Sequence, residues 1–168
     1  MGSGKTSTGL ALAERLGWEF VDLDEEIERQ ERLSVRMLFR ERGETRFRAL
    51  EHEALSRSLA GCSKPTILAL GGGAFVQRDN LELLRASAIR TVFLETPVEE
   101  MLQRCGVEDE PDEENPRPLA ADSSAFRKLY EQRLPFYRAA ELTIDTRAKT
   151  VSEIAREIAE GLELAASR

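Results

Sequence analysis

The first residues of the chain match part of a phosphate-binding pattern. The segment "MGSGKTST" contains Gly4-Lys5-Thr6, the last three positions of G-x-x-x-x-G-K-[ST]. This loop follows a buried β-strand and precedes a helix. Counting back from Gly4 places the leading glycine two positions before Met1, so we expect the natural protein to begin upstream of Met1. The pattern therefore predicts a parallel sheet with a strand ahead of Gly2.

The rest of the chain alternates between helical and strand patterns. We expect strands at "WEFVDLD", "PTILALGGGAF", "IRTVFLET" and "LTIDT". We expect helices in "STGLALAERLG", from Asp24 to about Glu31, in "VRMLFRERG" after Ser34, from Glu44 to about Leu59, in "VEEMLQRC" after Pro97, in "SAFRKLYEQRLPFY" until Pro135, and in "TVSEIAREIAEGLEL" after a capping box of Thr150 and Glu153. Strands that alternate with helices predict a three-layer α/β/α fold with a central parallel sheet, whose first strand is missing from the N-terminus.

Length and composition are those of one ordinary globular domain. The 168 residues are 41% hydrophobic and 33% charged, and the net charge of -7 argues against a duplex-DNA or anionic-membrane partner. No run approaches the roughly 18 apolar residues of a membrane span. We expect Cys62 and Cys105 to be reduced thiols in the cytoplasm, and His52 to be an exposed helix residue. The myristoylation letters M-G-x-x-x-[ST] are better explained by the phosphate loop.

Polar residues near the first loop predict a nucleotide site. Backbone amides of residues 2 to 6 would face phosphate oxygens at a helix N-terminus. Lys5 would reach the β- and γ-phosphates, and the Thr6 hydroxyl would bind Mg²⁺. Asp22 and Asp24 lie two apart at a strand end, where one could hold Mg²⁺ through water and the other could accept a substrate hydroxyl. A Gly-Ser tail and a charged helix start are the alternatives.

Further along the chain, arginines and glycines predict an anionic substrate. Arg48 and Glu51 share a helix face, for which a surface ion pair is the common reason. The glycines at 71–73 indicate either a ligand close to the backbone or a simple turn. Arg117 lies in a long polar segment, and Arg133 lies just before a proline. Several basic residues around a phosphate loop favour a binding role.

Taken together, these segments resemble the shikimate kinase family, which has the nucleoside-monophosphate-kinase-like, P-loop kinase fold. The resemblance runs from Met1 to about Thr146 and is carried by "GSGKTSTG", "FVDLDEEIE", "GETRFRALE", "ILALGGGAF", "RPLA" and "LYEQRLPFY". It implies transfer of the γ-phosphoryl group of ATP to the 3-hydroxyl of shikimate, with Mg²⁺, in the route to chorismate and the aromatic amino acids. It also implies one kinase domain over 1–168, with a core of 1–104 and 123–168 and a lid at about 105–122.

The resemblance also implies site roles for individual residues. ATP would be bound by Gly2, Ser3, Gly4, Lys5, Thr6, Ser7, Arg104 and Arg117, with Arg104 packed on the adenine and Arg117 closing from the lid. Mg²⁺ would be held by Thr6 and Asp22. Shikimate would be bound by Asp24, Phe39, Phe47, Arg48, Gly71, Gly72, Gly73 and Arg133. Catalysis would rest on Lys5, Asp24 and Arg117, with Asp24 holding the reacting hydroxyl and acting as base.

Two features depart from the family pattern and keep other functions open. The opening strand and first loop glycine are absent, and the acidic stretch "VEDEPDEENP" lies just ahead of Arg117, which predicts a mobile lid. One alternative is a ligand-sensing module of a larger regulator. Another is a related small-molecule kinase, such as one for gluconate. For the shikimate kinase we expect a cytoplasmic monomer whose partners are the small molecules shikimate and ATP.

Overall fold

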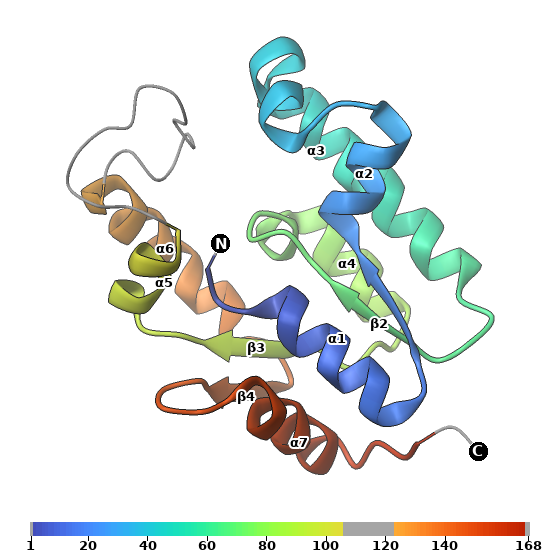
Figure 1. Cartoon of the computed structure of the whole chain (residues 1–168). Helices are drawn as coiled ribbons and strands as arrows, with labels where there is room; N and C mark the ends of the chain where they lie inside the picture. The colour runs from blue at the N-terminus through green and yellow to red at the C-terminus, as the bar shows by residue number, and fades with distance from the viewer. Residues whose placement is uncertain (1, 106–122, 167–168) are drawn as a thin grey trace.

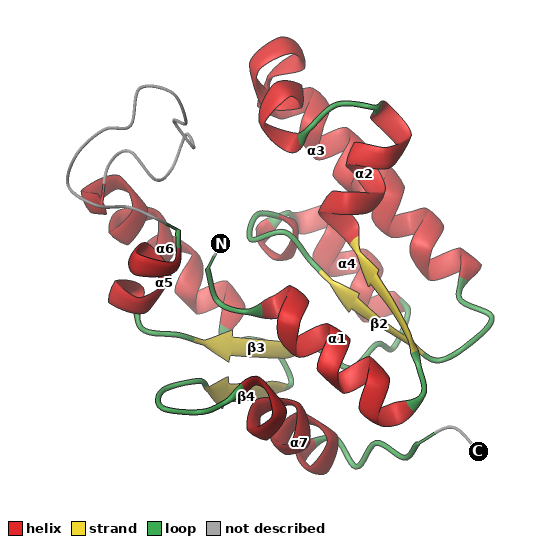
Figure 2. Cartoon of the chain, viewed as in Figure 1, coloured by secondary structure: helices red, strands yellow, loops and turns green. Residues whose placement is uncertain are grey.

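The computed structural model describes residues 2–105 and 123–166, which form helices and short strands in alternation (Figures 1 and 2). In order, the elements are α1 (Lys5–Leu16), β1 (Glu19–Asp22), α2 (Leu23–Glu31), α3 (Val35–Gly61), β2 (Thr66–Ala69), the 3₁₀ turn η1 (Ala74–Val76), α4 (Arg78–Ala86), β3 (Val92–Glu95), α5 (Val98–Arg104), α6 (Ser123–Tyr137), β4 (Leu142–Asp145) and α7 (Val151–Gly161). The expected lid, apart from Cys105, lies outside the described residues. The single-domain organisation stays a prediction.

The strands form two parallel pairs. β1 pairs with β2 from Glu19 opposite Thr66 to Asp22 opposite Ala69. β3 pairs with β4 in the same way, beginning with Val92 opposite Leu142. Within the described residues β2 and β3 are not paired with each other, so the sheet consists of two halves. The four expected strands are present and parallel, and the α/β fold is confirmed.

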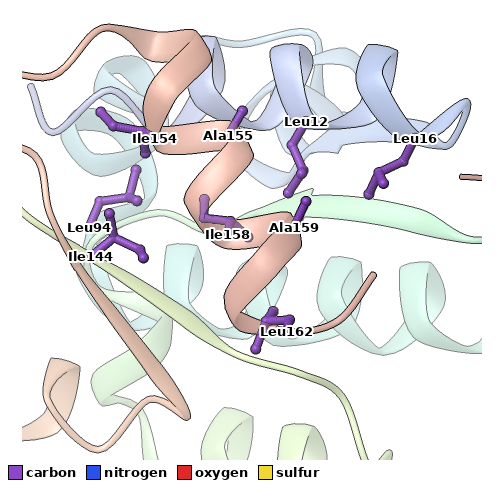
Figure 3. Packing of buried hydrophobic residues seen from close by; sticks show 9 residues of the cluster. All are labelled: Leu12, Leu16, Leu94, Ile144, Ile154, Ala155, Ile158, Ala159 and Leu162. Atoms are coloured by element: carbon purple, nitrogen blue, oxygen red, sulfur yellow. The ribbon is translucent and has the colours of Figure 1, made fainter. Parts of the chain in front are cut away.

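Helices cover both faces of these strands. On one face α1 and α7 pack together over β3 and β4, as Figure 3 shows. This cluster contains Leu12, Leu16, Leu94, Ile144, Ile154, Ala155, Ile158, Ala159 and Leu162. On the other face α2, α3 and α4 supply a second cluster: Leu23, Ile27, Leu38, Phe47, Leu50, Ala54, Leu55 and Leu84. Ile67 packs against the first cluster and Leu68 against the second, because successive side chains of a strand point to opposite faces.

Several helix ends follow directly from local sequence. α1 ends at Gly17, which has the left-handed conformation (φ 66°) that favours glycine. α3 consists of two helices joined at Gly43 (φ 75°, ψ 169°), where the sequence predicted the boundary. Thr150 and Glu153 form the predicted capping box of α7. Within the described part of the chain, no helix is long and apolar enough to cross a membrane.

Other local predictions were wrong. α4 was not predicted, because the buried position Asn80 is polar and shortens the apolar pattern. The strand expected to reach Asp24 ends at Asp22, whose side chain caps α2. α6 continues through Pro135 to Tyr137. Proline removes one backbone donor, and this loss is tolerated because it falls in the last turn of the helix.

Candidate active site

The phosphate-binding loop lies at the start of α1. Gly2 and Gly4 have positive φ angles of 71° and 81°, which glycine adopts without strain. The Gly2 carbonyl accepts a hydrogen bond from Arg104 Nη1 at 3.2 Å, and the Ser3 carbonyl accepts one from Thr96 Oγ1 at 3.4 Å. Lys5 Nζ donates to Ser3 Oγ at 3.2 Å. The loop is therefore held against α5 and the carboxyl end of β3.

The N-terminus of α1 is suited to an anion. Gly4 occupies the N-cap position of α1. Because glycine has no side chain, it makes no capping hydrogen bond to the first backbone amides of the helix. The first turn contains no acidic residue, although a helix N-terminus attracts negative charge. By contrast, the first turns of α2 and α7 carry acidic side chains. The first backbone amides of α1 are thus available to phosphate oxygens.

Asp22 connects this loop to α2. Its Oδ2 accepts a hydrogen bond from Thr6 Oγ1 at 2.8 Å, and its Oδ1 accepts one from the backbone amide of Asp24 at 3.1 Å. Asp24 lies in the first turn of α2, so the prediction that both aspartates belong to a strand end was wrong. The capping geometry nevertheless brings the two carboxylates together.

The electrostatics of the loop follow from burial and proximity. Burial raises the pKa of Asp24, and the negative charge of Asp22 raises it further, while Lys5 opposes the rise. Burial lowers the pKa of Lys5, against the opposing charges of Asp24 and Asp22. A carboxylate with a raised pKa is a better proton acceptor near neutral pH.

The glycines at 71–73 are explained by close side chains. A Cβ on Gly71 would lie 2.8 Å from Asp24 Oδ1, and a Cβ on Gly73 would overlap the Arg48 guanidinium. The carbonyl of Gly72 accepts a hydrogen bond from Tyr137 Oη at 2.5 Å. The glycine turn therefore lies between the two groups expected to contact substrate, and larger residues would displace them.

Arg48 is held in place by its neighbours on α3. Its Nη1 donates to Glu51 Oε2 at 2.9 Å, and its Nη2 donates to Glu44 Oε1 at 3.2 Å. Its guanidinium carbon lies 5.6 Å from the ring centre of Phe39 and 5.3 Å from that of Phe47. These contacts fix the direction of the guanidinium.

Glu51 is a site residue that the sequence did not reveal. The expected surface ion pair is buried, because the side chain of Glu51 is only 1% exposed. Its Oε1 has no hydrogen-bond partner among the described residues. Burial raises the pKa of Glu51, with Arg48 opposing the rise. Glu51 lies three residues after Arg48 and four before buried Leu55 on α3. This spacing, which places all three on one helix face, was the sequence signal that could have indicated its burial.

One cavity of about 990 Å³ brings most of these side chains together. It is lined by Ser3, Lys5, Asp24, Phe39, Phe47, Arg48, Gly71, Gly72, Gly73 and Arg133. Thr6 and Ser7 are exposed beside it, at the start of α1. Arg104 contacts the loop at Gly2 and pairs with Glu100. Arg117 lies outside the described residues.

Of the remaining candidate residues, Cys62 also lines this cavity, whereas His52 and Cys105 do not. His52 is half-buried, not exposed as predicted, and its Nδ1 lies 2.8 Å from Oδ1 of buried Asn80. Cys62 and Cys105 are both free, as predicted. Within residues 2–105 and 123–166 no group of three or more His, Cys, Asp or Glu side chains is placed to hold a metal ion.

Comparison with known proteins identifies the family. A profile of shikimate kinase sequences matches residues 1–163. The chain belongs to the shikimate kinase family. Shikimate kinase family members from Persephonella marina and Thermobifida fusca are 36% and 39% identical to it, over 94% and 98% of this chain and 92% and 91% of theirs. The resemblance seen in the sequence is therefore confirmed.

Solved structures of the shikimate kinase family have the same fold as this chain. The shikimate kinase from Acinetobacter baumannii in complex with shikimate has a TM-score of 0.85 and 37% identity, covering 97% of this chain and 88% of that one. The shikimate kinase from Bacteroides thetaiotaomicron has a TM-score of 0.84 and 29% identity, covering 98% and 94%. A sugar kinase at 20% identity and a TM-score of 0.57 shares the fold alone.

Proposed function

We propose that this protein transfers the γ-phosphoryl group of ATP to the 3-hydroxyl of shikimate, giving shikimate 3-phosphate and ADP. The observation that supports this most is the single cavity that contains Lys5, Asp24 and Arg48. A phosphate loop at one side and an oriented arginine at the other suit two anionic substrates. Membership of the shikimate kinase family supports the same reaction.

The residues of the cavity have distinct tasks in this reaction. Arg48 binds the substrate carboxylate through two parallel N–H donors, so it sets both position and direction. Asp24 accepts a hydrogen bond from the reacting hydroxyl and takes its proton as the oxygen attacks the γ-phosphorus. The bond from the γ-phosphorus to the β–γ bridging oxygen breaks, and ADP leaves. Lys5 and the first amides of α1 stabilise the phosphate charge.

The residues around Thr6 fit the Mg²⁺ that such a reaction uses. Mg²⁺ prefers oxygen ligands and is usually bound by one or two carboxylates together with water and substrate phosphates. The Thr6 hydroxyl and the Asp22 carboxylate are oxygen donors that lie 2.8 Å apart beside the phosphate loop. We therefore propose that they hold the ion, directly or through water, where it would neutralise phosphate charge.

Other expected roles stay predictions. Arg133 lines the cavity from α6, which places it where a substrate carboxylate or hydroxyl could bind. Arg104 donates a hydrogen bond to the Gly2 carbonyl in the phosphate-binding loop. Its packing on adenine stays a prediction. The closing role of Arg117, the cytoplasmic location and the monomeric state are likewise predictions.

A coupled assay of ADP release tests the proposal. With ATP and Mg²⁺, the protein should release ADP in proportion to shikimate, whereas a shikimate analogue without the 3-hydroxyl should bind without releasing ADP. Calorimetric binding of shikimate without any ADP release would overturn the proposal and favour the sensing module. ADP release with gluconate but not with shikimate would favour the related kinase.

A further inference from the structure

Asn80 is a fully buried polar residue that does not line the cavity. It lies in the first turn of α4, and its side chain bonds to two other elements. Its Nδ2 donates a hydrogen bond to the carbonyl oxygen of Ala74 in η1 at 3.1 Å, and its Oδ1 lies 2.8 Å from Nδ1 of His52 on α3. Because a buried amide without partners is costly, we expect both bonds to persist in the folded protein.

The chemistry of these groups gives each bond a direction. A backbone carbonyl oxygen can only accept, so the amide nitrogen of Asn80 faces Ala74 and its oxygen faces His52. The His52 nitrogen opposite that oxygen must then carry a hydrogen and donate it. We call this chain of donors, from His52 through Asn80 to the Ala74 carbonyl, the amide clamp.

The amide clamp joins the two walls of the proposed shikimate site. On α3 it begins one residue after Glu51, which bonds to Arg48. At the glycine turn of 71–73 it ends on Ala74, whose own backbone amide donates to the Gly71 carbonyl at 3.1 Å. The clamp therefore sets the spacing between the helix that holds Arg48 and the turn that faces it.

This spacing leaves little room for displacement. A Cβ on Gly73 would overlap the Arg48 guanidinium, and a Cβ on Gly71 would lie 2.8 Å from Asp24 Oδ1. A shift of the turn toward or away from α3 thus changes the space available to Arg48. Substrate binding is sensitive at this scale, since a misplacement of about 1 Å can lower activity by about 100-fold.

We propose that Asn80, oriented by His52, is a positioning residue that fixes the glycine turn against α3 and thereby sets the affinity for shikimate. The inference rests on the proposed function, because it takes Arg48 and the turn as the shikimate-binding side of the cavity. The substrate carboxylate held by Arg48 is remote from the reacting hydroxyl, so its contacts are the same before and during the chemical step. Loss of the clamp should therefore raise the KM for shikimate and leave kcat unchanged.

Replacing His52 tests the clamp without changing a cavity residue. His52→Leu removes the donor to Asn80, whereas His52→Asn keeps one, because Nδ2 of asparagine and Nδ1 of histidine are both bonded to Cγ. Ser56→Leu is the matched control, since it introduces the same side chain at an exposed position of α3. In assays of ADP release the shikimate KM should rise by about 5- to 100-fold in His52→Leu, with kcat and the KM for ATP within about twofold. His52→Asn and the control should stay within about twofold of the unchanged protein in all three quantities.

Hydrogen exchange measures the turn without any ligand. The backbone amides of Ala74 and Val76 donate to the Gly71 and Gly73 carbonyls. Both amides should exchange at least about fivefold faster in His52→Leu than in His52→Asn. If His52→Leu does not accumulate as folded protein, His52→Ala gives the same measurements, because alanine removes the donor and fits in the space that the imidazole leaves.

Two results would overturn the positioning role. One is a shikimate KM within about twofold of the original in the folded variant that lacks the donor, even if its free energy of unfolding is lower, because the clamp would then only stabilise the fold. The other is equal exchange at both amides in the variants with and without the donor. Failure of the proposed function is a different result, namely no ADP release with shikimate by the unchanged protein, and the exchange measurement still decides whether the clamp holds the turn.

Discussion

Replacing Gly73 by alanine tests whether the position of Arg48 controls shikimate binding. Gly73 has ordinary helical angles (φ -91°, ψ -24°), so alanine brings no backbone strain at this position. Its new Cβ would instead occupy the space of the Arg48 guanidinium. The whole effect of the substitution therefore passes through the displacement of one side chain.

The magnitude follows from the contacts of that guanidinium. A displaced Arg48 loses its aligned donors to a substrate carboxylate, and a charge-assisted hydrogen bond contributes about 1.5–3 kcal/mol. The dissociation constant of shikimate should rise by about 10- to 150-fold, since 1.4 kcal/mol corresponds to a factor of ten. Binding of ATP should stay within about twofold, because the three atoms nearest the new Cβ all belong to Arg48 and none to the phosphate loop.

Isothermal titration calorimetry with shikimate and with ATP measures both effects. Gly61→Ala is the matched control, because nothing lies within 4 Å of a Cβ at that glycine. The control should bind both ligands like the unchanged protein. A shikimate dissociation constant that stays within about twofold in folded Gly73→Ala would refute the placement of Arg48 as the carboxylate-binding residue.

Three further predictions concern charge and capping. Asp24→Asn should abolish ADP release while ATP binding stays within about twofold, because the amide cannot accept the proton; turnover near the original rate would contradict its role as base. Because burial raises the pKa of Glu51, stability is greatest below its ordinary pKa and falls as pH rises through the folded value. As pH rises above the ordinary glutamate pKa, the free energy of unfolding in urea should therefore fall less in Glu51→Gln than in the unchanged protein, and parallel pH curves would refute this. Thr150→Ala should lower the free energy of unfolding by about 0.5–2 kcal/mol, since it removes the capping box of α7, with Ser152→Ala as the control.

Features set by local chain geometry could be predicted from the sequence. Gly17, Gly43 and the pair Thr150–Glu153 each end, divide or begin a helix through their own backbone preference or side-chain reach. The four strands were likewise visible as apolar runs next to turns. These signals need only neighbouring residues, so one sequence is enough to detect them.

Features set by tertiary packing could not be predicted in the same way. The sequence indicates that Arg48 and Glu51 share a helix face, but burial of the pair depends on α3 packing behind the glycine turn. Asn80 is fully buried because it bonds to His52 and to the Ala74 carbonyl, which come from other elements. A polar residue in such a place masks the helical pattern of α4.

The two oxygens of Asp22 have a consequence for how ligands influence one another. One oxygen accepts from Thr6 and the other from the backbone amide of Asp24, so a single carboxylate joins the proposed nucleotide site at α1 to the proposed shikimate site at α2. A nucleotide that draws the Thr6 hydroxyl toward its own phosphates releases one of these tethers and changes the restraint on Asp24. If both sites bind as proposed, occupancy of one would alter the affinity of the other, and by thermodynamic reciprocity the two changes would be equal.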